Sequence, residues 1–502
     1  MLLAFFLIFV INFWVEKKLN TLLLQDKTST YSINYKKLDI SILSNSIYID
    51  SISIIPKKNN QNTNNKTKIF ATISTIEITN IGMIGILFKD KITAENIIIS
   101  NPKITFLTNE KTAEKEKDKA LQLLKKTVLI SAIYLKNAEV RIVNETSKKV
   151  LFTTHNLNIT LNRILLCDET ATKKIPFLFK SYSIECDRMY YHANEFYDIK
   201  SKKITITNTK LNISDFKLIP LYNRKQFVSK IAKEKDLFDV SSRDISINDM
   251  NWGFKDSVFF FNAKEVLIDK VVASIYRSKE PKDDLSKKKL YNRLLRDLKF
   301  NLHVDTFRIR HSFLIYEEEI ASKNGSGKLI FDKFNLTATN IQSGFNKTKL
   351  PDLTIAIDCK FMRNSPLHIH WKFNVMDKTD GFKIQGSITN LNLEKLNPFT
   401  KPYINLKTEG IFDKVEFNFV GDNISSSGKF SLEYDDLKVI IFKKKDRNKI
   451  NKFLSAIGNL FVKNDTNDKL KSTDVQVKRI QEKSFYNYLW LNITEGLKKL
   501  LI

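Results

Sequence analysis

The sequence predicts a mainly β protein that follows an N-terminal apolar segment, and three observations support this fold class. Many stretches alternate apolar with polar residues, which is the pattern of strands that bury one face. The chain has 36 Phe but only 13 Gly and 9 Pro, a composition that favours strands over catalytic sites built on tight loops. Hydrophobic residues make up 42% and charged residues 27%, so the chain can bury a core and is not of the disordered type.

The first fifteen residues form an uncharged apolar run that ends before Glu16, Lys17 and Lys18. We expect an uncleaved membrane anchor, because the basic N-terminal region and small-residue cleavage site of a signal peptide are not visible. Fifteen helical residues span about 22 Å against roughly 30 Å of hydrocarbon, so the anchor is short unless Leu19 to Leu24 extend it. Lys17 and Lys18 oppose export of the body, since positive charges favour the cytoplasmic side.

Strands are predicted from the point where the alternation begins. The first alternating residues are Leu38, Ile40, Ile42, Ile47 and Ile49. Further strands are predicted at 69–79 and 91–107, after an Asn- and Lys-rich loop at 56–68.

A pattern of two apolar pairs around an asparagine then recurs. The asparagines are Asn101, Asn137 and Asn208. Looser copies of the pattern begin at Ile245, Val266, Phe307 and Phe430, and in these copies the position of the asparagine is occupied by Asp249, Lys270, His311 and Tyr434. The step of five residues between the pairs would switch faces of a strand unless a β-bulge or tight turn absorbs one residue. Such a pattern matches by chance in about 3% of windows of this composition, so it supports strands rather than proven repeats.

Five stretches have helical patterns instead, at about 110–127, 221–238, 281–299, 446–463 and 480–502. Pro281 with Asp283 and Asp284 predicts the start of the third helix. The last two carry apolar stripes, which predict that they cover the body or lie on a membrane. These stripes consist of Phe453, Leu454, Ile457, Leu460 and Phe461, and of Phe485, Tyr488, Leu489, Leu497 and Leu500.

No catalytic, cofactor or metal site is predicted, and we expect the protein not to be an enzyme. Gly325 and Gly327 lack the strand-to-helix context of a phosphate-binding loop. His368 and His370 share one side of a predicted strand, but no third ligand has suitable spacing, so structural roles are favoured. The acidic residues 317–319 lie in a Lys-rich stretch and are predicted to form a solvated edge.

The net charge and the three cysteines give little information about binding partners, metal sites or disulfides. The net charge of +27 would suit nucleic acid or an anionic membrane surface, but the lysines are scattered, so no nucleic-acid partner is expected. Cys167, Cys186 and Cys359 are too few for a zinc site or a disulfide framework. A bridge between Cys167 and Cys186 and free buried thiols both remain open.

Strands with one apolar face allow two architectures. A sheet of about 20 strands at roughly 4.8 Å spacing would be on the order of 100 Å long, and if it were curved its apolar face would form a gutter that fits acyl chains. The same faces would otherwise pack on each other as a sandwich core. The periodicity does not distinguish the two.

Three segments share features with one family. Residues 35–56 (YKKLDISILSNSIYIDSISIIP) form an alternating strand pair, residues 92–106 (ITAENIIISNPKITF) contain an Asn-Pro kink, and the region from Gly410 onward ends in FLSAIGNLFVK and SFYNYLWLNITEGLKKLL. These segments resemble the AsmA-like family, anchored periplasmic proteins of Gram-negative bacteria related to TamB and YhdP, and the last is similar to members from Bacteroidota. The resemblance covers about a third of the chain.

The resemblance implies an elongated, curved β-groove that is anchored in the inner membrane and holds or conducts phospholipid between the inner and outer membranes, supporting outer-membrane integrity. It implies an anchor at 1–26, AsmA-like strands at 27–109, a β-groove body with helices at 110–445 and amphipathic helices at 446–502. The family offers no catalytic residues to carry over. The alternative is a scaffold or assembly factor for outer-membrane proteins that offers exposed strand edges.

The residues expected to line the groove come from the recurring pattern. They are Ile97, Ile99, Ile104, Phe106, Ile133, Leu135, Val140, Ile142, Ile204, Ile206, Leu211, Ile213, Phe307, Ile309, Leu314 and Tyr316. The expected partners are phospholipid, the inner membrane through the N-terminal helix, and outer-membrane proteins as an alternative.

Overall fold

The computed structural model describes residues 31–57, 67–82, 91–109, 127–171, 173–320, 325–442, 466 and 469–501. Backbone hydrogen bonds place the 22 strands of this part of the chain in one mixed sheet, which confirms the predicted β class. The predicted N-terminal anchor, the predicted helix at 446–463 and nearly all of that at 110–127 lie outside the described residues. The chain divides into two compact units, residues 1–194 with 198–214 and residues 195–197 with 215–502.

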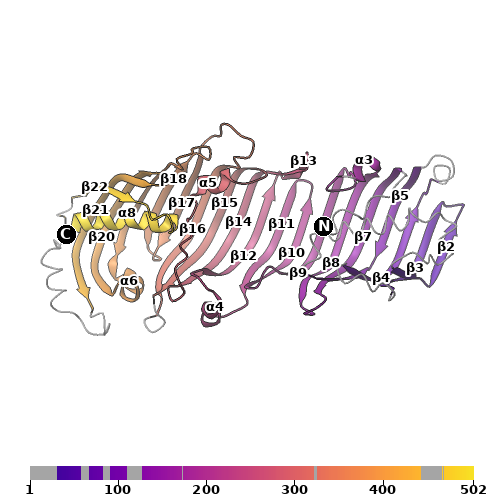
Figure 1. Cartoon of the computed structure of the whole chain (residues 1–502), viewed down its shortest axis with the longest axis horizontal. Coiled ribbons are helices and arrows are strands. Elements are labelled where there is room, and N and C mark those ends of the chain that lie inside the picture. Colours follow the sequence, from indigo (N-terminus) through magenta and orange to yellow (C-terminus); the bar gives the residue numbers. More distant parts are fainter. Residues whose placement is uncertain are drawn as a thin grey trace. The chain divides into compact units, whose positions relative to one another are not determined.

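The first unit contains the strands β1 to β9 and β10 from Asp198 onward (Figure 1). Its elements are β1 (Tyr31–Asn34), β2 (Lys37–Ser41), β3 (Ser46–Pro56), β4 (Lys68–Thr79), β5 (Lys91–Ser100), β6 (Lys103–Thr108), β7 (Thr127–Asn144), β8 (Val150–Leu166), α3 (Asp168–Ala171), β9 (Ser181–His192) and β10 (Tyr197–Thr207). β5 and β6 pair parallel to β7, and both pair antiparallel to β4. The strands predicted from Leu38 to residue 107 are confirmed, except that Ile42 lies in the turn after β2.

The second unit follows β11 (Lys210–Pro220), which begins in the first unit. Its elements are α4 (Arg224–Lys230), β12 (Asp236–Asn248), β13 (Asn251–Lys255), β14 (Val258–Ser278), α5 (Tyr291–Arg296), β15 (Asn301–Glu319), β16 (Gly327–Gln342), β17 (Leu353–Phe361), β18 (Ser365–Phe373), β19 (Phe382–Asn392), η3 (Leu393–Leu396), α6 (Asn397–Ile404), β20 (Leu406–Gly421), β21 (Ser425–Ile441), β22 (Lys471–Lys478) and α8 (Phe485–Leu501). β14 and β15 pair in parallel, and from β15 to β22 each strand pairs antiparallel with the next.

The helix α8 lies across the strands at the C-terminal end of the second unit (Figure 1). Phe485 stacks on Trp371 of β18 with ring centroids 4.4 Å apart, and Tyr488 meets Phe382 of β19 edge to face at 5.8 Å. Phe485 and Tyr488 are buried, while Leu489, Leu497 and Leu500 are partly buried against the same core. Within the range predicted as a helix, 480–502, residues 485–501 are helical, and of the two predicted roles the structure shows the helix packed on the body.

Two predicted helices are much shorter than expected. Within 221–238, only α4 is helical, with Asn223 and Gln226 forming its capping box, and β12 already begins at Asp236. Within 281–299, only α5 is helical, so the predicted start at Pro281 is wrong. The backbone there bonds to other segments instead, because the Lys288 N–H donates to the Gln481 carbonyl at 2.8 Å. Helical periodicity cannot reveal this competition from residues far along the chain.

The predicted bulges are present in several strands. Asn101, Asn137, Lys270 and His311 have φ angles of 50°, 52°, 51° and 51°, in the left-handed region, and the pairing register shifts beside Asn137 and beside His311. Asn101 lies between β5 and β6, and Asn208 and Asp249 occupy turns after β10 and β12, the second of the two predicted conformations. In the copy that begins at Phe430 the left-handed residue is Asp436, with φ 49°, and not Tyr434. Each bulge absorbs one residue, so the apolar side chains on both of its sides share one face.

The substitution Asn137→Val is expected to lower the free energy of unfolding by about 1–2 kcal/mol, because a β-branched residue is strained at positive φ. Asn137→Gly should cost less, since glycine adopts this conformation freely and the backbone N–H keeps its 3.0 Å bond to Asn158 Oδ1. Urea unfolding of the two variants is the measurement. Equal stabilities would show that the left-handed conformation does not matter there.

Candidate functional site

The strand register of the first unit aligns apolar side chains in rows that cross the sheet. One row consists of Ile49, Ile76, Ile99, Leu135, Ile159, Ile184 and Ile206. A second consists of Ile47, Ile78, Ile97, Ile133, Leu161 and Tyr182. Beyond the bulges a third row consists of Ile69, Phe106, Ile142 and Phe152. These rows form a continuous apolar face, and most of their members from β3 to β8 are buried.

The second unit has equivalent rows. One consists of Ile245, Ile268, Ile309, Leu336, Ile357, Ile369, Gly386, Phe417 and Phe430. The next consists of Ile247, Val266, Phe307, Ala338, Ile355, Trp371, Ile384 and Phe419. We call the face that carries both rows the inner face of this unit. On the opposite face of β17 and β18, Asp358 and His368 bond at 2.5 Å between Oδ1 and Nδ1, so polar groups gather there.

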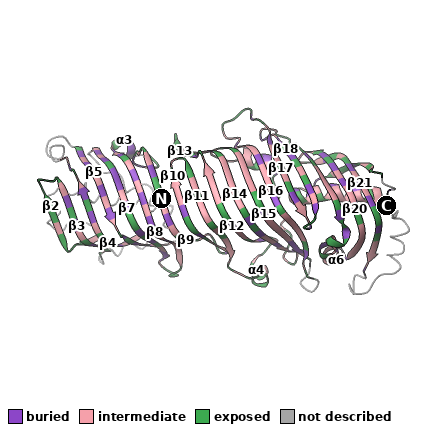
Figure 2. Cartoon of the chain, turned by 180° about the vertical axis from the view of Figure 1, so that it is seen from behind, coloured by how far each residue is buried: buried purple, intermediate pink, exposed green. Residues whose placement is uncertain are grey.

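The inner face changes its exposure along the second unit. Phe417, Phe419 and Phe430 are buried in the core that α8 completes. In contrast, Ile245, Ile268 and Ile309 are only half-buried, and Figure 2 shows β12, β14 and β15 mostly in the colour of intermediate burial. Aliphatic side chains that are only partly buried along this stretch of the row retain surface that another apolar molecule can bury.

The residues predicted to line a groove fall into two groups. Those that are buried are Ile97, Ile99, Ile104, Phe106, Ile133, Leu135, Val140 and Ile204. Those that are half-buried are Ile142, Ile206, Leu211, Ile213, Phe307, Ile309, Leu314 and Tyr316. The register brings the members on β5, β6, β7 and β10 together on one face of the first unit and those on β15 onto one face of the second. The prediction missed the rows on β16 to β21, such as Leu336, Ile357 and Phe417, although alternation in these stretches was a usable signal.

The acidic residues 317–319 do not form a solvated edge as predicted. Glu317 and Glu318 are buried. Arg224 Nη1 donates to Glu317 Oε2 at 3.0 Å, and Lys279 Nζ lies 3.3 Å from Glu318 Oε1. Burial alone would raise the pKa of Glu317, but hydrogen bonds from Arg224 and Ser326 lower it below the ordinary value. The carboxylate is therefore held ionised by its partners, which suits a structural ion pair better than proton transfer.

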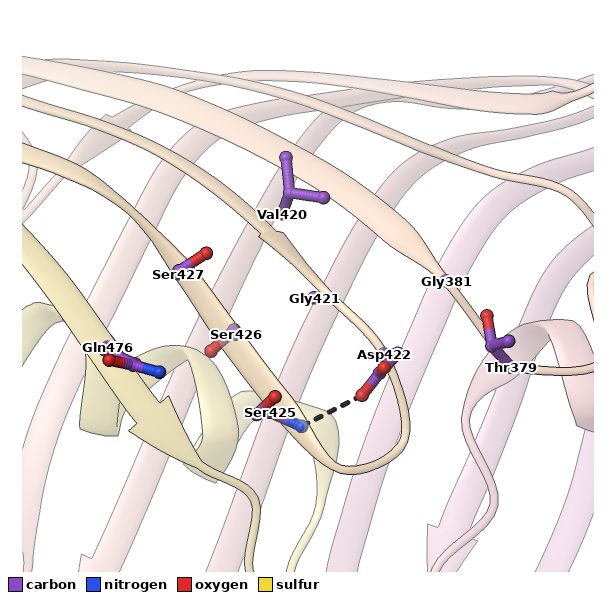
Figure 3. Close-up of a pocket in the computed structure, with 9 residues that line it drawn as sticks. All are labelled: Thr379, Gly381, Val420, Gly421, Asp422, Ser425, Ser426, Ser427 and Gln476. Atoms are coloured by element: carbon purple, nitrogen blue, oxygen red, sulfur yellow. Dashed lines mark hydrogen bonds between the residues drawn. The ribbon is translucent and has the colours of Figure 1, made fainter.

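A depression lined by β20, β21, β22 and the loop before β19 does not supply catalytic groups. Figure 3 shows its lining, which consists of Thr379, Gly381, Val420, Gly421, Asp422, Ser425, Ser426, Ser427 and Gln476. The only carboxylate, Asp422, accepts the Ile424 and Ser425 N–H groups through Oδ1 and so closes the hairpin turn. Serine hydroxyls without a neighbouring base are weak nucleophiles, so the lining does not form an activated nucleophile.

The cysteines are free thiols in the structure, so Cys167 and Cys186 are not bridged. Burial raises the pKa of Cys186 and raises that of Cys359 to about 12, which keeps both protonated and poorly reactive. Among the residues that the structure describes, no group of three or more His, Cys, Asp or Glu could hold a metal ion. Within the same ranges no helix is long and apolar enough to cross a bilayer.

No protein-family model matches this chain, and no curated protein sequence is significantly similar to it.

Proposed function

We propose that the apolar face of the sheet holds or conducts phospholipid, with acyl chains along the rows and headgroups in water. The observation that carries this proposal is the half-buried stretch of the inner face, on which Ile245, Ile268 and Ile309 stand next to one another in register. No chemical step is required. Anchoring of residues 1–26 in an inner membrane, with the body in the periplasm and transfer towards an outer membrane, follows from the resemblance to the AsmA-like family and is part of the same proposal.

The energetics of apolar contact fit such a role. Burial of each acyl methylene contributes roughly 0.8 kcal/mol, so a chain that covers several residues is held firmly. Successive positions of the row carry similar side chains, Ile268, Ile309, Leu336 and Ile357. A lipid that moves from one strand to the next exchanges one aliphatic contact for another, so the movement needs little free energy.

The direct test is to find the lipid. The body from residue 27 retains every described strand, so it can be exported behind a cleavable signal peptide, purified from the periplasm without detergent and extracted with organic solvent. Mass spectrometry is expected to find phospholipid at near-stoichiometric amounts, and a β-rich periplasmic protein purified in parallel gives the background. Lipid no higher than this background would contradict the proposal.

The scaffold alternative has less support. In the described part of the sheet, β22 pairs only with β21, so its other edge is the natural place for strand addition. This strand has eight residues and a lysine at each end. Short edges with lysines are typical of strands that avoid further pairing.

A further inference from the structure

The connection between β14 and β15 runs from one end of these strands to the other. The two strands pair in parallel, with Phe260 opposite Asn301 and Ser278 opposite Glu319. The chain leaves β14 after Ser278 and enters β15 at Asn301, so the connection must return over about 18 residues of strand, roughly 60 Å. We call this connection, residues 279–300, the strap.

The strap has little spare length. Six of its residues form α5, which rises about 9 Å, and the others reach at most about 60 Å when they are fully extended. A path of roughly 60 Å therefore uses most of the available length. The strap cannot lift far from the sheet while both strands remain paired.

The middle of the strap packs on the inner face of the second unit. Leu290 is 2% exposed in the core that contains Trp371, a member of the second row. The Tyr291 ring meets Trp371 edge to face with centroids 5.1 Å apart, and it meets Phe485 of α8 at 6.2 Å. The Tyr291 ring therefore lies where α8 meets the sheet.

Polar contacts fix the strap on both sides of Tyr291. Before it, the Lys288 N–H donates to the Gln481 carbonyl at 2.8 Å. After it, Asn292 Nδ2 donates to the Gly381 carbonyl at 3.0 Å. Asn292 is 2% exposed, so a strap that moved away would leave a buried amide without this partner. These contacts hold Tyr291 in one place against the sheet.

The half-buried part of the second row ends at this junction. Its half-buried residues are Ile247, Val266, Phe307 and Ile355, with the small, buried Ala338 among them. The next residue of the row, Trp371, is buried in contact with Tyr291 and Phe485. Close-packed rings leave no apolar surface on which a further molecule could lie.

We propose that the strap closes the lipid path in the second unit, so that acyl chains on the second row stop at Tyr291 and do not reach the face that α8 covers. The inference rests on the lipid-holding function proposed above and adds a fixed end to the path. Lipid on this unit then enters and leaves on the side away from α8, because the strap has no spare length with which to open the other side.

The test uses the full-length chain in vesicles of phosphatidylethanolamine and phosphatidylglycerol. The vesicles also contain a phosphatidylethanolamine with a photoactivatable diazirine near the end of one acyl chain. After irradiation, tandem mass spectrometry locates the lipid adducts. We expect adducts on Ile268, Ile309 and Tyr291, and none above the level of a sample kept dark on Phe485 and Leu489, which pack against the core from α8.

Three variants test whether the Tyr291 ring is the barrier. Tyr291→Ala should raise the adducts on Phe485 and Leu489 about tenfold, since the space left by the ring lets roughly two acyl methylenes be buried there. Tyr291→Phe keeps the ring and loses only the hydroxyl, which lies 3.5 Å from that of Tyr486. Leu294→Ala changes a residue of the same helix that is 47% exposed. The last two variants should give the wild-type pattern.

The outcomes separate this inference from the function on which it rests. Wild-type adducts on Phe485 and Leu489 as abundant as those on Ile268 would overturn the closed path and leave lipid on the sheet in place. Unchanged adducts on α8 in Tyr291→Ala, with a β-sheet content equal to the wild type by circular dichroism, would show that this ring is not the barrier. Absence of adducts on both Ile268 and Ile309 would contradict the proposed function itself, and the closed path with it.

Discussion

The substitution Ile268→Asp is expected to reduce about tenfold the phospholipid that co-purifies with the body, while the fold persists. Loss of contact with two acyl methylenes removes about 1.6 kcal/mol, which corresponds to slightly more than one decade in affinity. A carboxylate beside an acyl chain would also lose part of its hydration. Ile268 is half-buried, so in the absence of lipid its replacement can remain solvated and should not unfold the sheet.

Val272→Asp is the matched control for this variant. Val272 belongs to the same strand, β14, and is 55% exposed, but the bulge at Lys270 places it on the face opposite Ala273 and Ile268. The lipid content of this variant should equal that of the wild type. If both variants lose lipid equally, or if Ile268→Asp retains it, the inner face is not where the acyl chains lie.

Phe430→Ala is expected to lower the free energy of unfolding of the second unit by about 3–5 kcal/mol, as is usual for truncation of a buried aromatic ring. Phe430 is fully buried between Phe417 on the neighbouring strand and Gly496 of α8. The cavity would open beneath the helix, so both the sheet and its cover lose contacts. Chemical denaturation followed by tryptophan fluorescence measures the loss.

Two further variants test whether the close packing of α8 on β21 accounts for the loss of stability in Phe430→Ala. A Cβ at Gly496 would overlap the Phe430 ring, so Gly496→Ala should destabilise although alanine is the better helix former by about 1 kcal/mol. Val420→Ala, at an exposed position of β20, should change the stability by less than about 0.5 kcal/mol. A stabilising Gly496→Ala would mean that α8 does not pack closely on β21.

Local patterns predicted the strands and the bulges because both depend on neighbouring residues. The alternation from Leu38 onward and the five-residue step at Asn137 report on the pleat of a single strand. The length of α5 and the burial of Glu317 were not predictable in this way. Both depend on partners far along the chain, Gln481 in one case and Arg224 in the other, and no periodicity encodes such pairs.

The candidate site was predicted in part for the same reason. The pattern found Phe307 and Ile309, but it could not show that Leu336 and Ile357 complete their rows, because register between strands is a property of the folded sheet. The exposure of each residue in a row depends on the element that packs on it. The position of α8 over Phe430 cannot be predicted from the sequence of β21 alone.

The bulge at Asn137 determines, separately for each half of β7, which side chains point to the apolar face of the sheet. Ile133 and Leu135 precede it, and Val140 and Ile142 follow it in alignment with β6. If the chain lost one residue at this point, the second pair would rotate to the polar face while the first pair stayed in place. Such bulged strands tolerate substitution of side chains more readily than any change in length at the bulge, and gaps between related sequences should avoid these positions.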